Sequence, residues 1–199
     1  MDARTRVAVL ISGGGSNMAA LVEAAKASDA PHRIVLVLSN NPDAGGLAIA
    51  RASGVEAIAI DHRPFGKDRE AHEREIDAAL EAAGVGVVAL AGYMRVLTPW
   101  LVGRWSGKML NIHPSLLPKY PGLHTHARAI ESGDAEAGCT VHLVTDGVDE
   151  GPILGQARVA LVAGDTPDTL AQRVLVAEHE LYPRMLAEFC TQQNGVSRS

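Results

Sequence analysis

The sequence predicts an α/β fold with a doubly wound, mostly parallel sheet, and three features of the chain support this prediction. Short aliphatic runs that are apolar on both faces alternate with Ala-rich helical stretches as far as about residue 115, as expected of parallel strands covered by helices. A glycine-rich loop follows the first run, at the point where a strand would give way to a helix. Two later β-rich stretches are separated by a short Gly/Asp loop, which is typical of antiparallel pairing.

The first half of the chain has a regular alternation of expected strands and helices. The strands are expected at Val7–Ile11, Ile34–Leu38, Val55–Ile60, Val85–Ala91 and Lys108–Ile112. The helices between them are expected over Asn17–Ser28, about Ala44–Ser53, and Asp68–Ala83. The last helix has the clearest pattern, because Ile76 and Leu80 recur at helical spacing opposite a face of Glu, Arg and His. This alternation predicts a Rossmann-like arrangement.

The C-terminal part is expected to extend one edge of this sheet. Ala137–Val144 and Pro152–Val162 predict antiparallel C-terminal edge strands. Thr166-Pro167 predicts the start of a final long helix, with Thr as the N-cap and Pro at the first helical position. The polar residues Asn194–Ser199 predict a frayed tail. Because no repeat or long linker divides the chain, we expect one domain over residues 1–199 with its core at about 6–190.

Composition narrows the classes of function. The chain has 199 residues, of which 47% are hydrophobic and 21% charged, with a net charge of −5. That acidity, with only two Trp, three Tyr and two Phe, argues against a nucleic-acid partner. No apolar run approaches the roughly 20 residues of a membrane span. Two unpatterned cysteines, Cys139 and Cys190, fit a reducing compartment, so we expect a cytoplasmic protein without a membrane partner.

The glycine-rich loop Gly13–Asn17 indicates an anion site. Glycines let the backbone approach a ligand closely, and the N-terminus of the following helix offers unpaired N–H groups. A dinucleotide fingerprint would need glycine in place of Met18 and an acidic residue within Ser39–Asn41, and no Gly-Lys-Ser/Thr sequence follows for a nucleoside triphosphate. A phosphate monoester is therefore favoured. The alternative is a tight structural turn in which Ser16 or Asn17 caps the helix.

Asn111-Ile112-His113 places an amide and an imidazole on the same side of a strand end. Such a pair can donate two hydrogen bonds to an oxyanion. Pro114, Pro118 and Pro121 then stiffen the loop that follows. The alternative is a structural histidine at a strand end.

The loop Thr145–Gly151 supplies acidic groups. These are Asp146, Asp149 and Glu150. One such carboxylate beside His113 would favour the protonated imidazole and could relay protons, whereas the alternative is a solvated acidic turn. A metal site is a further alternative, because His124 and His126 lie two residues apart and His113 and His142 could add further imidazoles. No cysteine or suitably spaced carboxylate accompanies them, so no metal is expected.

Met94-Arg95-Val96-Leu97 follows the fourth expected strand and could form the wall of a site for a planar, apolar ligand. Arg69 and Arg95 could then meet a carboxylate-bearing part of that ligand. Taken alone, each arginine could equally be a solvated surface charge.

The run Asn111–Pro118 resembles the signature of the folate-dependent formyltransferases. Lys119–His126, with the sequence Lys-Tyr-Pro-Gly-Leu-His-Thr-His, resembles the branch of this family that acts in purine synthesis. Further matches are Ile11–Asn17, Leu90–Arg95, Val141–Asp146 and Asp149–Pro152. The resemblance extends from about Val7 to Pro183.

This resemblance implies direct formyl transfer from 10-formyltetrahydrofolate, as a co-substrate, to the amine of 5-phosphoribosylglycinamide. The implied catalytic residues are Asn111, His113 and Asp149. The implied contacts to the ribonucleotide are Gly15, Ser16, Asn17 and Glu178. The implied contacts to the folate are Arg69, Met94, Arg95, Val96, Leu97, Asn111, Thr145, Asp146, Gly147, Val148 and Asp149. Both partners are small molecules, and the protein is expected to be a monomer or homodimer without a metal.

Two positions depart from the family pattern. Glu150 stands where relatives often carry glycine, and Leu175 is apolar where some relatives have a polar residue near the ribonucleotide. The rival activities within the family are methionyl-tRNA formyltransferase and 10-formyltetrahydrofolate hydrolase. The first is expected to have an RNA-binding domain after the catalytic one and the second a regulatory domain before it, so the length of 199 residues disfavours both. A rival of another class is a non-catalytic phosphate-binding module, which would need only the glycine loop.

Overall fold

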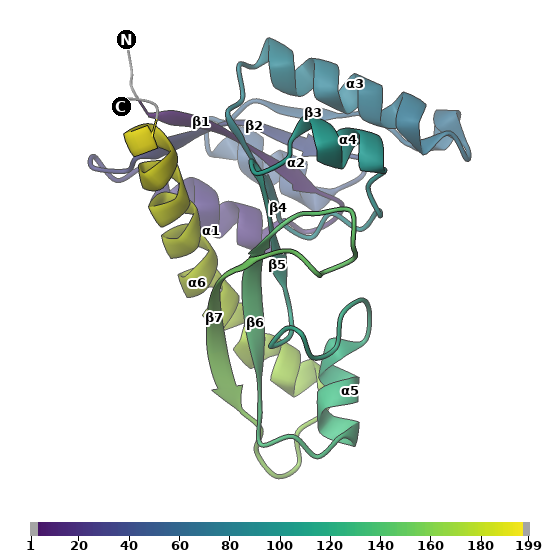
Figure 1. Cartoon of the computed structure of the whole chain (residues 1–199), viewed down its shortest axis with the longest axis vertical. Helices are drawn as coiled ribbons and strands as arrows, with labels where there is room; N and C mark the ends of the chain where they lie inside the picture. The colour runs from purple at the N-terminus through teal and green to yellow at the C-terminus, as the bar shows by residue number, and fades with distance from the viewer. Residues whose placement is uncertain (1–3, 197–199) are drawn as a thin grey trace.

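The computed structural model describes residues 4–196, which contain one seven-stranded sheet in the order β3-β2-β1-β4-β5-β6-β7. The strands are β1 Thr5–Ile11, β2 His32–Ser39, β3 Ala57–Ala59, β4 Val87–Leu90, β5 Met109–His113, β6 Glu136–Leu143 and β7 Ile153–Ala160. The helices are α1 Ser16–Ala24, α2 Gly45–Ala52, the 3-10 helix η1 Arg63–Phe65, α3 Arg69–Ala82, α4 Pro99–Arg104, α5 Thr125–Glu131 and α6 Pro167–Val196 (Figure 1).

The pairing of the strands confirms the predicted fold class. β1 to β5 are parallel to one another, whereas β6 is antiparallel to β5 and β7 is antiparallel to β6. The order of the strands reverses between β1 and β4, because the chain passes from β3 at one edge back to the centre of the sheet. In open sheets of this kind, ligands bind outside the carboxyl ends of the strands at such a switch point.

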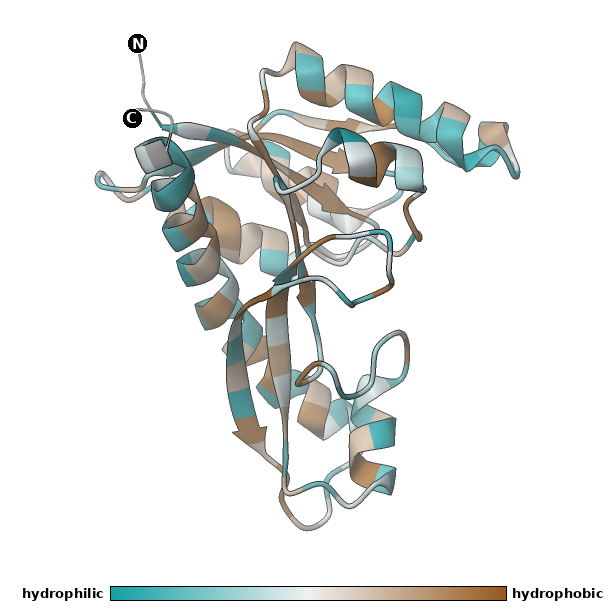
Figure 2. Ribbon diagram, viewed as in Figure 1, coloured by the Kyte–Doolittle hydropathy of each residue, from teal (hydrophilic) through white to brown (hydrophobic). Residues whose placement is uncertain are grey.

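The sheet is covered on both faces, as its doubly apolar strands require. Along β1, Val7, Val9 and Ile11 face one hydrophobic cluster and Ala8 and Leu10 face the other, because successive side chains of a strand point to opposite faces. The first cluster is completed by α1, α2, α5 and α6, and the second by α3 and α4 (Figure 1). Hydropathic colouring shows the apolar residues concentrated in the central strands (Figure 2). Each fully buried large aliphatic side chain contributes roughly 1.5–3 kcal/mol to folding.

Several element boundaries differ from the expected ones for identifiable reasons. β3 starts only at Ala57, since the N–H of Val55 donates to Ala50 O at 3.0 Å and closes the end of α2. The short helices α4 and α5 were not predicted from the apolar pattern, and α5 follows His124, whose φ of 58° is left-handed. Short helices carry too few apolar positions to show a 3.6-residue period.

The end of α6 corrects the expected polar tail. Residues 194–196 are helical, whereas a frayed tail was expected from Asn194. Thr5 Oγ1 donates to Asn194 Oδ1 at 3.1 Å, and Asn194 Nδ2 donates to Pro31 O at 3.4 Å. These contacts to the start of the sheet explain the helical state of Asn194. The remainder of the expected tail, residues 197–199, lies outside the described residues.

The predicted start of α6 is confirmed. Pro167 is its first residue, and Thr166 Oγ1 accepts a hydrogen bond from the N–H of Thr169 at 3.2 Å, the geometry of a side-chain N-cap. Asp68 caps α3 in the same way, by accepting from the N–H of Ala71 at 3.0 Å. Both capped helices carry residues expected in the site: α3 begins with Arg69, and α6 contains Glu178.

Within residues 4–196, no helix combines the length and apolar character needed to cross a membrane. Cys139 and Cys190 are buried free thiols. Burial raises the pKa of each to about 12, which keeps both in the protonated, unreactive form at neutral pH.

A buried histidine at the start of β2 predicts a loss of stability in acid. His32 is 1% exposed, and neither ring nitrogen has a hydrogen-bond partner. Burial, with a smaller effect of the Arg4 charge, lowers its pKa from 6.5 to about 4. The unfolded chain therefore takes up a proton between these pH values that the folded chain excludes, so stability falls as pH falls from 6.5 to 4, by about 3 kcal/mol in total.

Urea unfolding of the wild type and His32→Gln at pH 7 and pH 4.5 tests this expectation. The variant should lose about 2 kcal/mol less than the wild type between the two pH values. Val35→Ala, a non-titrating change on the same strand, should retain the wild-type pH dependence. Equal losses in His32→Gln and the wild type would show that His32 does not contribute to acid sensitivity.

Candidate active site

The loop between β1 and α1 forms one wall of an open pocket at the switch point. Gly15 is the N-cap residue of α1 and has a left-handed φ of 74°. The loop lies beside the end of β4, and together they surround a pocket of about 420 Å³. Its lining residues are Ser12, Gly13, Gly14, Gly15, Ser16, Asn17, Ala91, Gly92 and Met94. Backbone N–H groups at the start of α1 point toward such a site in general, and the helix dipole favours an anion there.

The close approach of the backbone of α2 requires glycine at position 15 of this loop. A Cβ on Gly15 would lie 2.9 Å from Gly46 Cα, and Gly46 is in the first turn of α2. The N–H of Gly46 also donates to Gly13 O at 3.0 Å. The start of α2 therefore packs directly on the loop and fixes its shape.

Ser12 joins three strand ends around the pocket. Its Oγ donates to Asn40 Oδ1 at 2.6 Å and accepts from the N–H of Met94 at 2.8 Å. These contacts link the loops that follow β1, β2 and β4. Asn40 thus has a structural role at the place where a dinucleotide site would need an acidic residue.

Asn17 and Glu178 meet across the pocket rim. Asn17 Nδ2 donates to Glu178 Oε2 at 2.7 Å, which connects the first turn of α1 to α6. Glu178 is only 7% exposed. Burial raises the pKa of its carboxyl, and the hydrogen bond from Asn17 opposes that rise. One turn further along α6, the hydroxyl of Tyr182 lies 3.0 Å from Leu90 O and 3.2 Å from Leu110 O, and so anchors α6 to β4 and β5.

The end of β5 carries Asn111 and His113, and the antiparallel neighbour β6 lies beside them. In the β5–β6 register, Asn111 is opposite His142 and His113 is opposite Thr140. Asn111 Nδ2 lies 3.2 Å from His142 Nε2. His113 Nε2 lies 2.9 Å from Tyr120 O, and its Nδ1 lies 3.3 Å from Asp149 Oδ2.

Asp149 is held by backbone and side-chain contacts in the loop after β6. Its φ of 56° is left-handed, and its Oδ2 accepts from the N–H of Gly122 at 2.8 Å. Its Oδ1 lies 3.6 Å from His142 Nε2. Burial alone would raise the pKa of Asp149, but the hydrogen bonds from His142 and Gly122 and the nearby histidines lower it. The carboxylate is therefore the stable form at neutral pH.

Both histidines have polar partners on each ring nitrogen. His113 lies between two acceptors, the Tyr120 carbonyl and the Asp149 carboxylate. His142 Nδ1 lies 2.8 Å from Leu143 O, and its Nε2 faces both the Asn111 amide at 3.2 Å and Asp149 Oδ1 at 3.6 Å. The site therefore combines two imidazoles, an amide and a carboxylate within a few ångströms.

A second group of expected site residues lies around the loop after β4. Arg69 Nη1 donates to Val96 O at 3.2 Å, which joins the start of α3 to Met94–Leu97. Met94 and Val96 are exposed apolar side chains, as is Val148 in the loop after β6. Arg95 lies close enough to His72 and Tyr93 for its charge to act on both. Thr145 and Asp146 are exposed in the same loop as Val148.

The structure thus brings the expected residues into two neighbouring sets and adds contacts that the sequence analysis missed. His142 was considered only as a metal ligand, whereas it contacts both Asn111 and Asp149. Its alternation with Thr140 along β6 was the available signal. Tyr120 O and Gly122 N–H are backbone contacts without a sequence signal of their own. Among residues 4–196, no group of three His, Cys, Asp or Glu side chains is arranged to hold a metal ion.

Comparison with known proteins relates this geometry to a family. Residues 5–186 match the family described as formyl transferase. The chain is 45% identical over 183 residues to phosphoribosylglycinamide formyltransferase of Escherichia coli (strain K12), covering 92% of this chain and 86% of that protein. The crystal structure of phosphoribosylglycinamide formyltransferase from Brucella melitensis superposes with a TM-score of 0.90 at 53% identity, covering 94% of this chain and 96% of that one.

Some relatives are much longer than this chain. The trifunctional purine biosynthetic protein adenosine-3 of Drosophila melanogaster is 48% identical over 186 residues, which cover 92% of this chain but only 14% of that protein. The match therefore concerns one segment of the insect protein. Since the family match covers nearly all of the described residues, the chain belongs to the formyl transferase family.

Proposed function

We propose that this protein transfers the formyl group of 10-formyltetrahydrofolate to the amine of 5-phosphoribosylglycinamide, a step of purine biosynthesis. The observation that carries the proposal is the cluster of Asn111, His113 and Asp149 at the end of β5, beside a glycine loop suited to a phosphate. The choice of substrates follows the names of the E. coli and B. melitensis relatives.

The ribonucleotide would occupy the pocket at the switch point. Its phosphate would bind Gly15, Ser16 and Asn17, whose backbone N–H groups begin α1. Glu178 already accepts from Asn17 at 2.7 Å, and its carboxyl would meet the glycinamide portion. In this proposed arrangement, the substrate amine would lie on the side of β4 and β5.

The folate would lie along the loops after β4 and β6. The exposed apolar side chains Met94, Val96 and Val148 suit a planar ring system. Leu97, Asn111 and the residues Thr145, Asp146, Gly147 and Asp149 would complete this side. Arg69 and Arg95 provide positive charge for the glutamate tail.

In the proposed reaction, the amine of the ribonucleotide attacks the formyl carbon directly. A C–N bond forms, and the formyl oxygen becomes an oxyanion that the Asn111 amide and the protonated His113 stabilise. The C–N bond to folate N10 then breaks, and the carbonyl is restored. The proton leaves the attacking amine and reaches N10 with help from Asp149.

The contacts of Asn111 and His113 leave a donor available on each. An Asn amide has two N–H groups, so one can face His142 Nε2 while the other meets the oxyanion. For His113, Nε2 is engaged by Tyr120 O at 2.9 Å, whereas Nδ1 and Asp149 are separated by 3.3 Å. That longer contact leaves the Nδ1 proton as the one that can be shared with a substrate oxygen.

The cellular location and the assembly of the protein are also part of the proposal. We propose a single cytoplasmic formyltransferase domain over residues 1–199, working without a metal or nucleic acid as a monomer or homodimer. Two free thiols and the net charge of −5 support this view.

The absorbance of the folate product tests the proposed activity directly. Purified protein mixed with 10-formyltetrahydrofolate and 5-phosphoribosylglycinamide should release deformylated folate only when both are present. Release without the ribonucleotide would instead indicate a hydrolase. Binding of the ribonucleotide without any release would indicate a phosphate-binding module.

Removal of the two oxyanion donors should reduce turnover more than substrate affinity. We expect Asn111→Ala and His113→Ala each to lower kcat by about 10²–10³-fold, because one preformed donor to the oxyanion is lost. KM for both substrates should change only a few-fold, as measured by steady-state kinetics. A kcat near that of the wild type in both variants would contradict the assignment.

Glu178→Gln should raise stability at neutral and alkaline pH while weakening substrate binding. Because burial raises the pKa of Glu178, its favourable protonated form is lost as pH rises through the folded-state pKa. Gln does not ionise and can still accept from Asn17, so the Tm gain over the wild type should grow from pH 4.5 to pH 8. Each kcal/mol corresponds to roughly 2–4 °C in a chain of this size.

The same variant should have a higher KM for 5-phosphoribosylglycinamide, since the carboxylate facing the glycinamide is gone. Glu180→Gln, a change at an exposed position on the same helix, serves as the control and should alter neither quantity. A Tm difference that is constant with pH would show that ionisation of Glu178 does not limit stability.

A further inference from the structure

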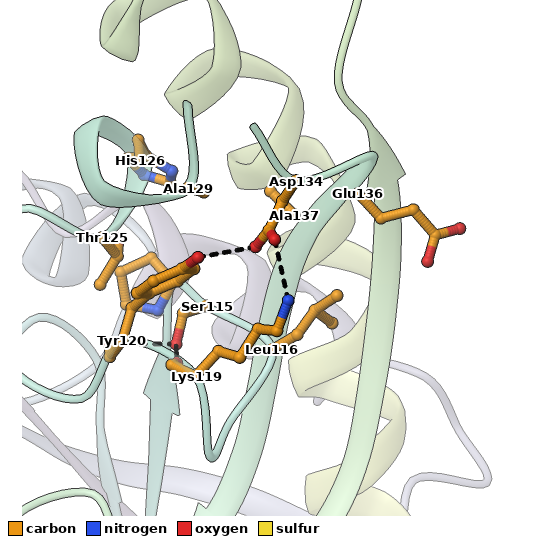
Figure 3. A pocket seen from close by; sticks show the side chains of 11 residues that line it. Ser115, Leu116, Lys119, Tyr120, Thr125, His126, Ala129, Asp134, Glu136 and Ala137 are labelled. Carbon is orange, nitrogen blue, oxygen red and sulfur yellow. Dashed lines mark hydrogen bonds and ion pairs between the residues drawn. The ribbon is translucent and has the colours of Figure 1, made fainter. Parts of the chain in front are cut away.

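A clamp outside the active site fixes the backbone carbonyl that contacts His113. The clamp consists of Tyr120, Asp134 and Lys119 (Figure 3). We propose that Tyr120 and Asp134 are positioning residues for His113, acting through the carbonyl of Tyr120. This inference rests on the proposed function and deepens it, because it assigns a role in formyl transfer to residues that touch neither substrate.

Tyr120 has an unusual backbone conformation. Its φ of 57° is left-handed, a region that side chains other than Gly, Asn and Asp rarely adopt. Such a conformation is strained and persists only where the surrounding structure imposes it. Here it turns the Tyr120 carbonyl toward His113 Nε2 at 2.9 Å and toward Ser115 Oγ at 3.2 Å.

A set of contacts imposes this conformation. The hydroxyl of Tyr120 donates to Asp134 Oδ2 at 2.8 Å, and Lys119 Nζ donates to Asp134 Oδ1 at 2.9 Å. These two contacts use both oxygens of one carboxylate to hold two successive residues of the loop. The hydrogen bonds from Lys119 and then Tyr120 lower the pKa of Asp134, so the acceptor remains charged at neutral pH.

Close packing around the clamp restricts other positions of the ring. The Arg128 guanidinium lies over the Tyr120 ring at 5.1 Å, and its Nη1 donates to Pro121 O at 2.6 Å. The surrounding side chains leave a cavity of only about 10 Å³, roughly the space of one water molecule. Figure 3 shows the Tyr120 ring extending from the loop toward Asp134, which lies just before β6.

The clamp is connected to the proposed formyl transfer through His113. His113 is held between Tyr120 O and Asp149, and its Nδ1 proton can meet the oxyanion only in the ring orientation that these two acceptors define. Loss of the clamp frees the Tyr120 carbonyl to leave Nε2, so the ring loses one of its two fixed points. Turnover should fall while KM remains nearly unchanged, because Tyr120 and Asp134 are not among the residues proposed to contact either substrate.

Kinetics of three variants test this assignment. Tyr120→Phe and Asp134→Ala should each lower kcat by about tenfold, the effect of one hydrogen bond, with KM within twofold of the wild type. Asp134→Asn retains an oxygen acceptor for the Tyr120 hydroxyl and should recover most of that loss. Arg158→Gln breaks the neighbouring exposed ion pair with Glu136 and serves as the control that should leave kcat unchanged.

A double-mutant cycle with His113→Ala separates positioning from general support of the fold. If the clamp acts through His113, Tyr120→Phe should not lower the residual kcat of His113→Ala any further. An equal loss in both backgrounds would overturn the proposal, as would a KM increase that matches the loss in kcat.

A spectroscopic readout keeps this test independent of turnover. In ¹H–¹⁵N spectra of the histidine side chains, the hydrogen-bonded Nε2–H of His113 is assigned by its absence in His113→Ala. It should shift or broaden in Tyr120→Phe and stay in place in Arg158→Gln. An unchanged signal in Tyr120→Phe would refute the clamp even if formyl transfer is confirmed, and a changed signal in a protein without formyl transfer would refute only the proposed function.

Discussion

The antiparallel pairing of β5 with β6 is the constraint on which the candidate active site depends. In a wholly parallel sheet, the strand next to β5 would also end at the ligand edge and would be followed by a helix. Here β6 runs in the opposite direction, so His142 lies opposite Asn111 and β6 ends beside the start of β5, where the N–H of Val144 donates to Met109 O at 2.9 Å. The loop that follows folds back toward the other end of β5. That return places the Asp149 carboxylate 3.3 Å from His113. The grouping of Asn111, His113 and Asp149 therefore depends on the antiparallel strand and on the fold-back of the loop that follows it.

Asp149 in turn determines the electrostatics of the group. A half-buried carboxylate between two imidazoles and a backbone N–H remains ionised because its hydrogen bonds outweigh the cost of burial. In the proposed reaction, this charged carboxylate is the group that would help the proton leave the attacking amine. His142 supplies the second imidazole, whose Nε2 lies near both the Asn111 amide and the same carboxylate.

The fold and the site differ in how far they could be predicted from the sequence. The strands and the start of α6 have local signals, namely doubly apolar runs and the pair Thr166-Pro167, and the structure confirms them. The frayed tail expected from Asn194 was not found at residues 194–196, which are helical. The contacts of Asn194 with Thr5 and Pro31 join residues far apart in the chain, so no local pattern could reveal them. The role of His142 depends on the β5–β6 register, and no local pattern specifies a register between strands.

Backbone groups, rather than charged side chains, hold much of this site, and this explains how an acidic chain can be suited to anions. The glycine loop depends on the close approach of Gly15 to Gly46, and helix N-termini such as that of α1 offer N–H groups to an anion. The group of His113 and Asp149 depends on the Gly122 N–H and the Tyr120 carbonyl. Several residues of the Lys119–His126 run therefore act by setting backbone conformation: Tyr120 and His124 both have positive φ. A net charge of −5 does not oppose such a site. Aligned peptide dipoles act on an anion from a few ångströms away, whereas most surface charges lie farther from it and are screened by salt.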